Sequence, residues 1–186
     1  MKTPKIMIIR HAEKPEHHVV AGVDLQGQPD TKSLTPQGWQ RAGALVQFFA
    51  PGDDGAPPPP LARPMHLFAA YADPATDDDS KRPYQTLGPL SAYLGPTASI
   101  DDSCGKDELQ KLVDKVSGLV GTVLIAWEHR RIPSVARLLV EPGVHVPDWP
   151  DDRFDVVWVF DRQGSAWQLT QVPQLLLAGD RSTTFA

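Results

Sequence analysis

Two histidines in this sequence stand just beyond runs of apolar residues. His11 follows Arg10 at the end of the run 6–9, and His129 follows the run 123–127 after one intervening residue. Runs of this length are typical of strands that are buried on both faces of an α/β sheet. Ligands of such sheets bind beyond the carboxyl ends of the strands. We therefore expect both histidines and Arg10 to lie at one ligand-binding crevice.

Arg82 adds a second arginine to this set. Pro83 follows it, and proline is favoured in the first turn of a helix, so Arg82 is expected at a helix N-terminus. Free N–H groups and the helix dipole favour an anion there. Two arginines, two histidines and a helix N-terminus match a dianionic, tetrahedral group. Phosphate is the foremost candidate, because guanidinium groups pair with its oxygens in a bidentate manner.

The rest of the chain alternates strands and helices that could position these residues. Helical spacing, with capping or proline signals, predicts helices at 36–50, 83–94 and 106–120 and a short one from 133. Strands are predicted at 6–9, 65–71, 97–100 and 122–127, and a period-two hairpin at 154–161 and 166–172. This order favours a three-layer α/β/α sandwich with a mainly parallel central sheet and a C-terminal antiparallel hairpin edge. Residues 1–186 are expected to form a single domain.

Composition narrows the classes of function. The 186 residues carry a formal net charge of -5, which argues against a nucleic-acid binder. No apolar run approaches the roughly 20 residues of a membrane helix, and the first residues show no signal-peptide pattern. Cys104 is the one cysteine, so no intrachain disulfide can form, and its neighbours do not suggest an activated thiol. We expect a cytoplasmic protein with neither nucleic acid nor membrane as a partner.

A segment without helical or strand period follows the first strand over residues 15–33. A connection of this length is usually functional. It contains His17 and His18, but no cysteine or carboxylate lies at metal-ligand spacing from them. We expect these histidines to be solvated or adjacent to substrate, and we predict no metal site.

Four stretches resemble motifs of the histidine phosphatase (phosphoglycerate-mutase-like) superfamily, and they occur in the order found in that family. Residues 10–13 (Arg-His-Ala-Glu) resemble its opening Arg-His-Gly motif, and residues 34–42 its Leu-Thr-x-x-Gly-x-x-Gln-Ala stretch. Residues 82–86 are similar to its Arg-x-x-Gln-Thr element, and 123–129 to the strand that ends in its second histidine. Together they span roughly residues 6–139.

The resemblance implies that His11 is a nucleophile that is transiently phosphorylated. Arg10, Arg82 and His129 would then hold the non-bridging oxygens of the transferring group, with no metal and no cofactor. A histidine attacks only when it is neutral, and nearby arginines disfavour its charged form. We also expect the second ring N–H of His11 to donate to a backbone carbonyl, so that a bare nitrogen faces phosphorus.

The sequence leaves the proton donor open. Ala12 replaces the glycine of the first motif, and Arg130 follows the second histidine where the acid-phosphatase branch of the family has an aspartate. Three carboxylates are therefore candidates for the general acid. Glu108 matches the mutase-type donor approximately in position, whereas Glu13 and Glu128 flank the two histidines.

The resulting hypothesis is a metal-independent phosphatase that acts on a phosphomonoester, or on a protein phosphohistidine, through phospho-His11. Its partner would be a phosphorylated small molecule or a phosphoprotein. Lys14 and Arg130 add positive charge next to the expected pocket, which suits a substrate with further anionic groups. The short chain leaves no room for the large insertions of mutases and so favours hydrolysis. The alternative is a noncatalytic phospho-ligand or partner-binding module that retains the anion pocket. The oligomeric state stays open.

Overall fold

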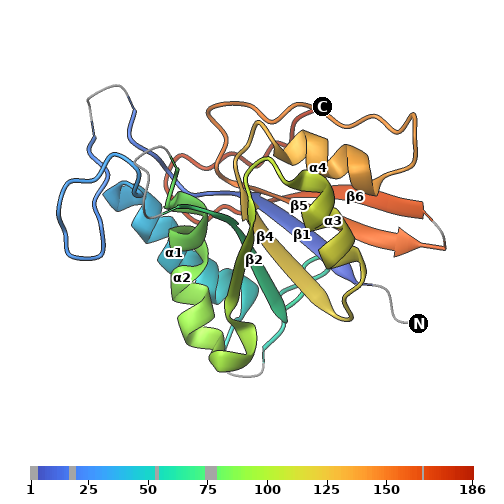
Figure 1. Ribbon diagram of the computed structural model, residues 1–186, viewed down its shortest axis with the longest axis horizontal. Helices are drawn as coiled ribbons and strands as arrows, with labels where there is room; N and C mark the ends of the chain where they lie inside the picture. The colour runs from blue at the N-terminus through green and yellow to red at the C-terminus, as the bar shows by residue number, and fades with distance from the viewer. Residues whose placement is uncertain (1–3, 17–19, 53–54, 74–78, 165) are drawn as a thin grey trace.

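The chain folds around a central sheet of six strands in the order β3-β2-β4-β1-β5-β6 (Figure 1). The computed structural model describes residues 4–16, 20–52, 55–73, 79–164 and 166–186, so the predictions for His17 and His18 lie outside the described residues. The strands are β1 (Lys5–Arg10), β2 (His66–Tyr71), β3 (Ile100–Gly105), β4 (Thr122–Trp127), β5 (Val156–Gln163) and β6 (Ala166–Pro173). The helices are α1 (Pro36–Phe49), α2 (Arg82–Leu94), α3 (Leu109–Ser117) and α4 (Ile132–Leu139), with a short 3-10 turn at Pro96–Ala98.

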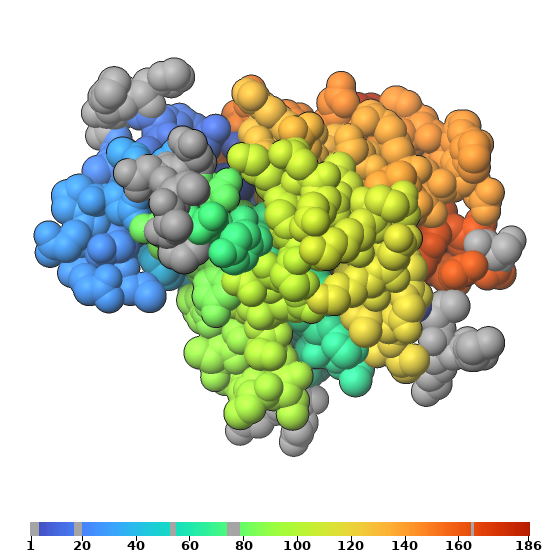
Figure 2. All heavy atoms as spheres, in the orientation of Figure 1, coloured from blue at the N-terminus to red at the C-terminus, as the bar shows by residue number. Residues whose placement is uncertain are grey.

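The four strands β1 to β4 are parallel, and β5 and β6 add an antiparallel hairpin at one edge. Helices α1 and α2 cover one face of the sheet, and α3 and α4 cover the other (Figure 1). The space-filling view shows that residues 100–140 cover the face turned toward the reader (Figure 2). This arrangement is the predicted three-layer sandwich with a mainly parallel sheet.

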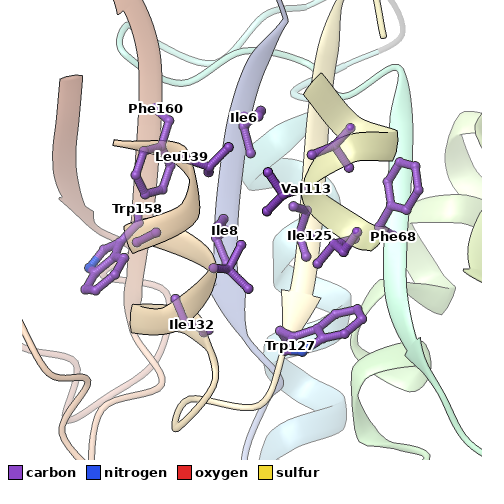
Figure 3. Close-up of a cluster of buried hydrophobic side chains, with 14 of the residues drawn as sticks. Ile6, Ile8, Phe68, Val113, Ile125, Trp127, Ile132, Leu139, Trp158 and Phe160 are labelled. Atoms are coloured by element: carbon purple, nitrogen blue, oxygen red, sulfur yellow. The ribbon is translucent and has the colours of Figure 1, made fainter. Parts of the chain in front are cut away.

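The apolar run of β1 is continuous because both faces of the strand are buried. Ile6 and Ile8 pack in the cluster under α3 and α4, whereas Met7 and Ile9 pack in the cluster under α1 and α2. Figure 3 shows Ile6 and Ile8 among side chains from β4, α3 and α4. Side chains alternate between the two faces of a strand, so a strand covered on both faces must be apolar at every position. Burying each such side chain contributes about 1.5–3 kcal/mol, which holds the last residues of β1 firmly in place.

The start of α1 is fixed against the loop after β1. The hydroxyl of Thr35 accepts from the Gly38 N–H at 3.2 Å and caps the helix, and the Thr35 N–H donates to the Glu13 carbonyl at 3.0 Å. A Cβ on Gly38 would lie 2.5 Å from the same Glu13 oxygen. Glycine at this position therefore allows the helix to approach the loop that carries the site residues.

The prediction was wrong around β3. Residues 96–98 form the 3-10 turn, and the strand begins at Ile100 rather than ending there. Helix α3 is also shorter than the predicted 106–120. Strand β3 pairs with β2 alone at the edge of the sheet. An edge strand can expose polar residues, and the Asp101-Asp102-Ser103 sequence of β3 hides the strand pattern. The predicted hairpin is confirmed, although β5 begins at Val156 and extends to Gln163.

Candidate active site

The carboxyl ends of β1 and β4 bring the two histidines to one cavity. These neighbouring strands are parallel with Arg10 opposite Trp127, and the His11 N–H continues the ladder to the Trp127 carbonyl at 3.0 Å. A cavity of about 190 Å³ lies beyond these strand ends. It is lined by His11, Lys14, Ala70, Tyr71, Asp79, Ser80, Arg82, Pro83, Lys106, Glu128 and His129. The lining therefore brings together His11, His129 and Arg82 as predicted, whereas Arg10, which was expected at the same crevice, is buried behind it and is not part of the lining.

His11 is held in the tautomer that suits a nucleophile. Its side chain is buried, and Nδ1 lies 2.7 Å from the Ala12 carbonyl oxygen. A carbonyl oxygen can only accept, so Nδ1 carries the proton and Nε2 of the neutral ring is bare. This is the predicted contact with a backbone carbonyl. Burial lowers the pKa of His11 well below 6.5, and the charge of Arg82 lowers it further, so the ring is neutral at pH 7.

Thr86 ties the His11 loop to the start of α2. Its buried hydroxyl accepts from the Ala12 N–H at 2.9 Å and donates to the Arg82 carbonyl at 2.7 Å. Next to it, the Gln85 amide accepts from the Leu34 N–H at 2.9 Å. The threonine and glutamine of the 82–86 stretch therefore position the site, a role that the sequence did not reveal.

Both arginines have guanidinium nitrogens without a partner among the described residues. Arg10 Nη1 donates to the carbonyls of Asp151 at 2.6 Å and Arg153 at 3.1 Å, and its guanidinium stacks 3.7 Å from the centre of the Phe154 ring. Arg82 Nη1 donates to the Thr31 carbonyl at 3.0 Å. In the described part of the chain, no partner reaches the buried Nε and Nη2 of Arg10 or the buried Nε of Arg82.

These free nitrogens point to an anion. A buried N–H group without a partner costs about 1–3 kcal/mol, and more when it is charged, so native proteins rarely leave one unused. Burial lowers the pKa of Arg10 to about 10, and burial also lowers that of Arg82. Arg10 remains charged at pH 7 nonetheless. The charges of Arg82 and Arg10 both act on His11, so an oxyanion bound next to His11 would offset them.

His129 has a carboxylate partner that the sequence did not predict. Its buried ring places Nε2 2.5 Å from Oδ1 of Asp151, and Nδ1 is buried without a partner among the described residues. Burial and Arg10 lower the pKa of His129, whereas Asp151 opposes that change. His129 in turn lowers the pKa of Asp151. No sequence signal marks Asp151, which lies in an aperiodic segment 22 residues from His129.

The three candidate acids lie in different places. Glu13 accepts from Arg41 Nε and Nη2 at 2.9 and 2.8 Å and does not line the cavity of His11. Glu108 accepts from the Gly105 N–H at 2.8 Å and from Lys111 at 3.0 Å, contacts that hold its pKa below the usual range, and it too lies outside that cavity. Of the three, Glu128 lines the cavity together with His11 and His129.

The other charged residues near this cavity differ in whether they line it. Lys14 lines it, and burial and Arg10 lower the pKa of the Lys14 ammonium. Arg130 is exposed, lies outside the lining and has Nε 4.0 Å from Asp151. Asp79, which the sequence did not single out, lines the cavity with its carboxylate 3.4 Å from the Lys106 ammonium. Lys14 also lines a second cavity of about 810 Å³, so it borders both.

The described ranges contain no group of three or more histidine, cysteine, aspartate or glutamate side chains arranged to hold a metal ion. Nor does any helix within them have the length and apolar character needed to cross a membrane.

Comparison with known proteins relates the fold to solved structures. No protein-family model matches the chain, and neither does any curated protein. YhfR of Bacillus stearothermophilus matches with a TM-score of 0.53 at 14% identity, over 96% of this chain and 98% of that one. The protein histidine phosphatase SixA complexed with tungstate gives 0.52 at 16%, over 91% and 97%. Phosphoglycerate mutase from Plasmodium falciparum gives 0.53 at 13%, over 100% of both chains. The chain shares the overall fold of these three proteins, which is the fold that the resemblance of its sequence motifs implied.

Proposed function

We propose that this protein is a phosphatase that hydrolyses a phosphomonoester, or a protein phosphohistidine, through a phosphohistidine at His11. The observation that supports this most strongly is the set of three guanidinium nitrogens of Arg10 and Arg82 without partners in the described chain, near a neutral histidine. The tungstate complex of SixA is consistent with the proposal, because tungstate is a tetrahedral oxyanion like phosphate.

In the first step the bare Nε2 of His11 attacks phosphorus. The new N–P bond forms as the bond from phosphorus to the leaving group breaks, while Nδ1–H stays bonded to the Ala12 carbonyl. Arg10, Arg82 and His129 stabilise the charge on the non-bridging oxygens. Phosphoryl transfer depends mainly on positioning and on such positive charge, and this site supplies both.

Glu128 is the glutamate we assign to proton transfer. As an acid it would protonate the leaving oxygen when the phosphorus bond breaks, and as a base it would then take a proton from the water that attacks phospho-His11. Its place in the lining of the His11 cavity supports this assignment. Asp79 lines the same cavity but is paired with Lys106, so it is the weaker candidate.

The size of the cavity favours hydrolysis over a mutase reaction. Its volume of about 190 Å³ is below the 300–1,000 Å³ typical of small-molecule sites, so it suits the phosphoryl group rather than a whole substrate. A mutase must retain its intermediate and let it reorient. The cavity beyond Lys14 could receive the rest of the substrate.

The test is turnover of an aryl phosphate in the presence of a chelator. The wild-type protein should release phosphate and form an acid-labile phosphoenzyme, and His11→Ala should abolish both. His145→Ala is the matched control, because His145 is exposed and lines neither the cavity of His11 nor the larger cavity beyond Lys14. Full activity of His11→Ala would refute the assignment. Phosphate binding without turnover or phosphoenzyme would favour a noncatalytic module, and transfer of phosphate between substrate positions would indicate a mutase.

A further inference from the structure

Asp151 contacts two of the residues expected to hold phosphate. It lies in the segment between α4 and β5, where its carbonyl oxygen accepts from Arg10 Nη1 at 2.6 Å. Its carboxylate Oδ1 lies 2.5 Å from Nε2 of His129. The side chain of His129 is 3% exposed and that of Asp151 is 75% exposed. A surface carboxylate therefore reaches a buried ring.

The contact with Asp151 decides which ring nitrogen of His129 carries a proton. An ionised carboxylate can only accept, so Nε2 of His129 is protonated. In the neutral ring Nδ1 is then bare, and it is buried without a partner among the described residues. A bare nitrogen would direct its lone pair at a phosphoryl oxygen and repel it. His129 can hold the anion through Nδ1 only when Nδ1 is protonated as well, that is, as an imidazolium.

We infer that Asp151 is a positioning residue for phosphoryl transfer: its carboxylate orients His129 through Nε2 and stabilises the imidazolium whose Nδ1–H donates to a phosphoryl oxygen. This inference rests on the proposed function and adds the protonation state of His129, one of the residues proposed to hold the phosphoryl group. It also gives the segment 150–153 a role, because the same residue holds Arg10 through its carbonyl.

The charges around His129 make this carboxylate important. Arg10 and Lys14 on the β1 side disfavour a charged His129, whereas the neighbouring His11 is neutral. Asp151 opposes them, although Arg130 lies 4.0 Å from its carboxylate. Glu128 and Asp79 line the same cavity. Without the Asp151 charge, burial and the neighbouring cations would lower the pKa of His129 further. The ring would then lose its second proton at a lower pH, and the bound anion would lose one hydrogen-bond donor.

The test is the pH profile of Asp151→Asn, which keeps the size of the side chain and removes its charge. Activity that needs the imidazolium falls as pH rises through the pKa of His129. We therefore expect the alkaline limb of kcat/KM to move down by about one pH unit. The variant should be about tenfold slower above that limb and close to wild type well below it. Because the carboxylate is largely exposed, the variant should fold normally, as its melting temperature would show.

Asp148→Asn is the matched control. Asp148 lies in the same segment, is 95% exposed and pairs with Arg137 at 3.3 Å. Its pH profile should overlay that of the wild type. If Asp151→Asn lowers the rate equally at every pH, or leaves the limb in place, the inference is wrong.

Affinity for sulfate, a tetrahedral dianion like phosphate, separates this inference from the proposed function. Calorimetric titration between about pH 5 and 7, around and below the ordinary pKa of histidine, reports the donor on His129 whether or not the protein turns over. A steeper loss of affinity in Asp151→Asn than in wild type supports the inference even if no phosphatase activity is found. Equal pH dependence in the two proteins rejects it even if the phosphatase is active.

Discussion

Arg41 in α1 and Arg10 at the end of β1 are both almost fully buried, with 3% and 1% exposure, but their partners differ. Each nitrogen of Arg41 has an acceptor: Glu13 and Asp180 supply carboxylates and Gln174 an amide oxygen. Arg10 is held by uncharged groups, backbone carbonyls and the Phe154 ring, and two of its nitrogens have no partner among the described residues.

The difference separates an arginine whose charge is compensated by carboxylates of the fold from one whose charge is not, and the proposed function assigns the second to an anion. Burial lowers the pKa of Arg41, but the bonds to Asp180 and Glu13 more than compensate and raise it. At Arg10 burial prevails and lowers the pKa. Burying the charges of Arg10 and Arg82 costs free energy, and an anion that binds between them would offset part of that cost.

Replacing Arg41 should have the largest effect on stability. Arg41→Leu leaves the carboxylates of Glu13 and Asp180 buried without their cation, and breaking a buried ion pair in this way costs about 3–5 kcal/mol. Urea unfolding should show this loss in the free energy of unfolding. If the free energy of unfolding is unchanged, the cluster does not stabilise the fold and the contrast with Arg10 fails.

Replacing Arg82 should act on the rate instead. Arg82→Leu removes the one hydrogen bond that the guanidinium makes within the described part of the chain, to the Thr31 carbonyl. It should therefore change the free energy of unfolding by about 1 kcal/mol or less. It also removes a cation from the phosphoryl oxygens, which should lower kcat/KM about 10²–10³-fold. The same leucine substitution at Arg41 is the control. Full activity in Arg82→Leu would place the anion elsewhere.

Local sequence patterns mark part of this site. The buried runs located β1 and β4, so Arg10, His11 and His129 could be placed at neighbouring strand ends, and Pro83 placed Arg82 at a helix N-terminus. Such positions depend on strand period and helix caps, which are properties of a few consecutive residues.

The partners of these residues could not be found in that way. The contact of His129 with Asp151 depends on the path of an aperiodic segment, and that of Glu13 with Arg41 joins residues 28 apart in the chain. Both are set by tertiary packing. For the same reason Glu13, Glu108 and Glu128 could not be ranked as acids before the structure placed one of them in the lining of the cavity.

The same comparison can be made between two carboxylates. Glu13 belongs to the ion-pair cluster of Arg41, whereas Glu128 lines the cavity of His11. Glu128→Gln should lower the rate of phosphoenzyme formation about 10²-fold with an alkyl phosphate, whose leaving oxygen needs a proton. With an activated aryl phosphate the loss should be about tenfold or less, since that leaving group departs without protonation. Single-turnover kinetics with the two substrates measure this difference.

Glu13→Gln is the control: it should destabilise the fold through Arg41 and show no such dependence on the leaving group. An equal loss with both substrates in Glu128→Gln would mean that Glu128 shapes the cavity without transferring a proton, and Asp79 would become the carboxylate to replace next.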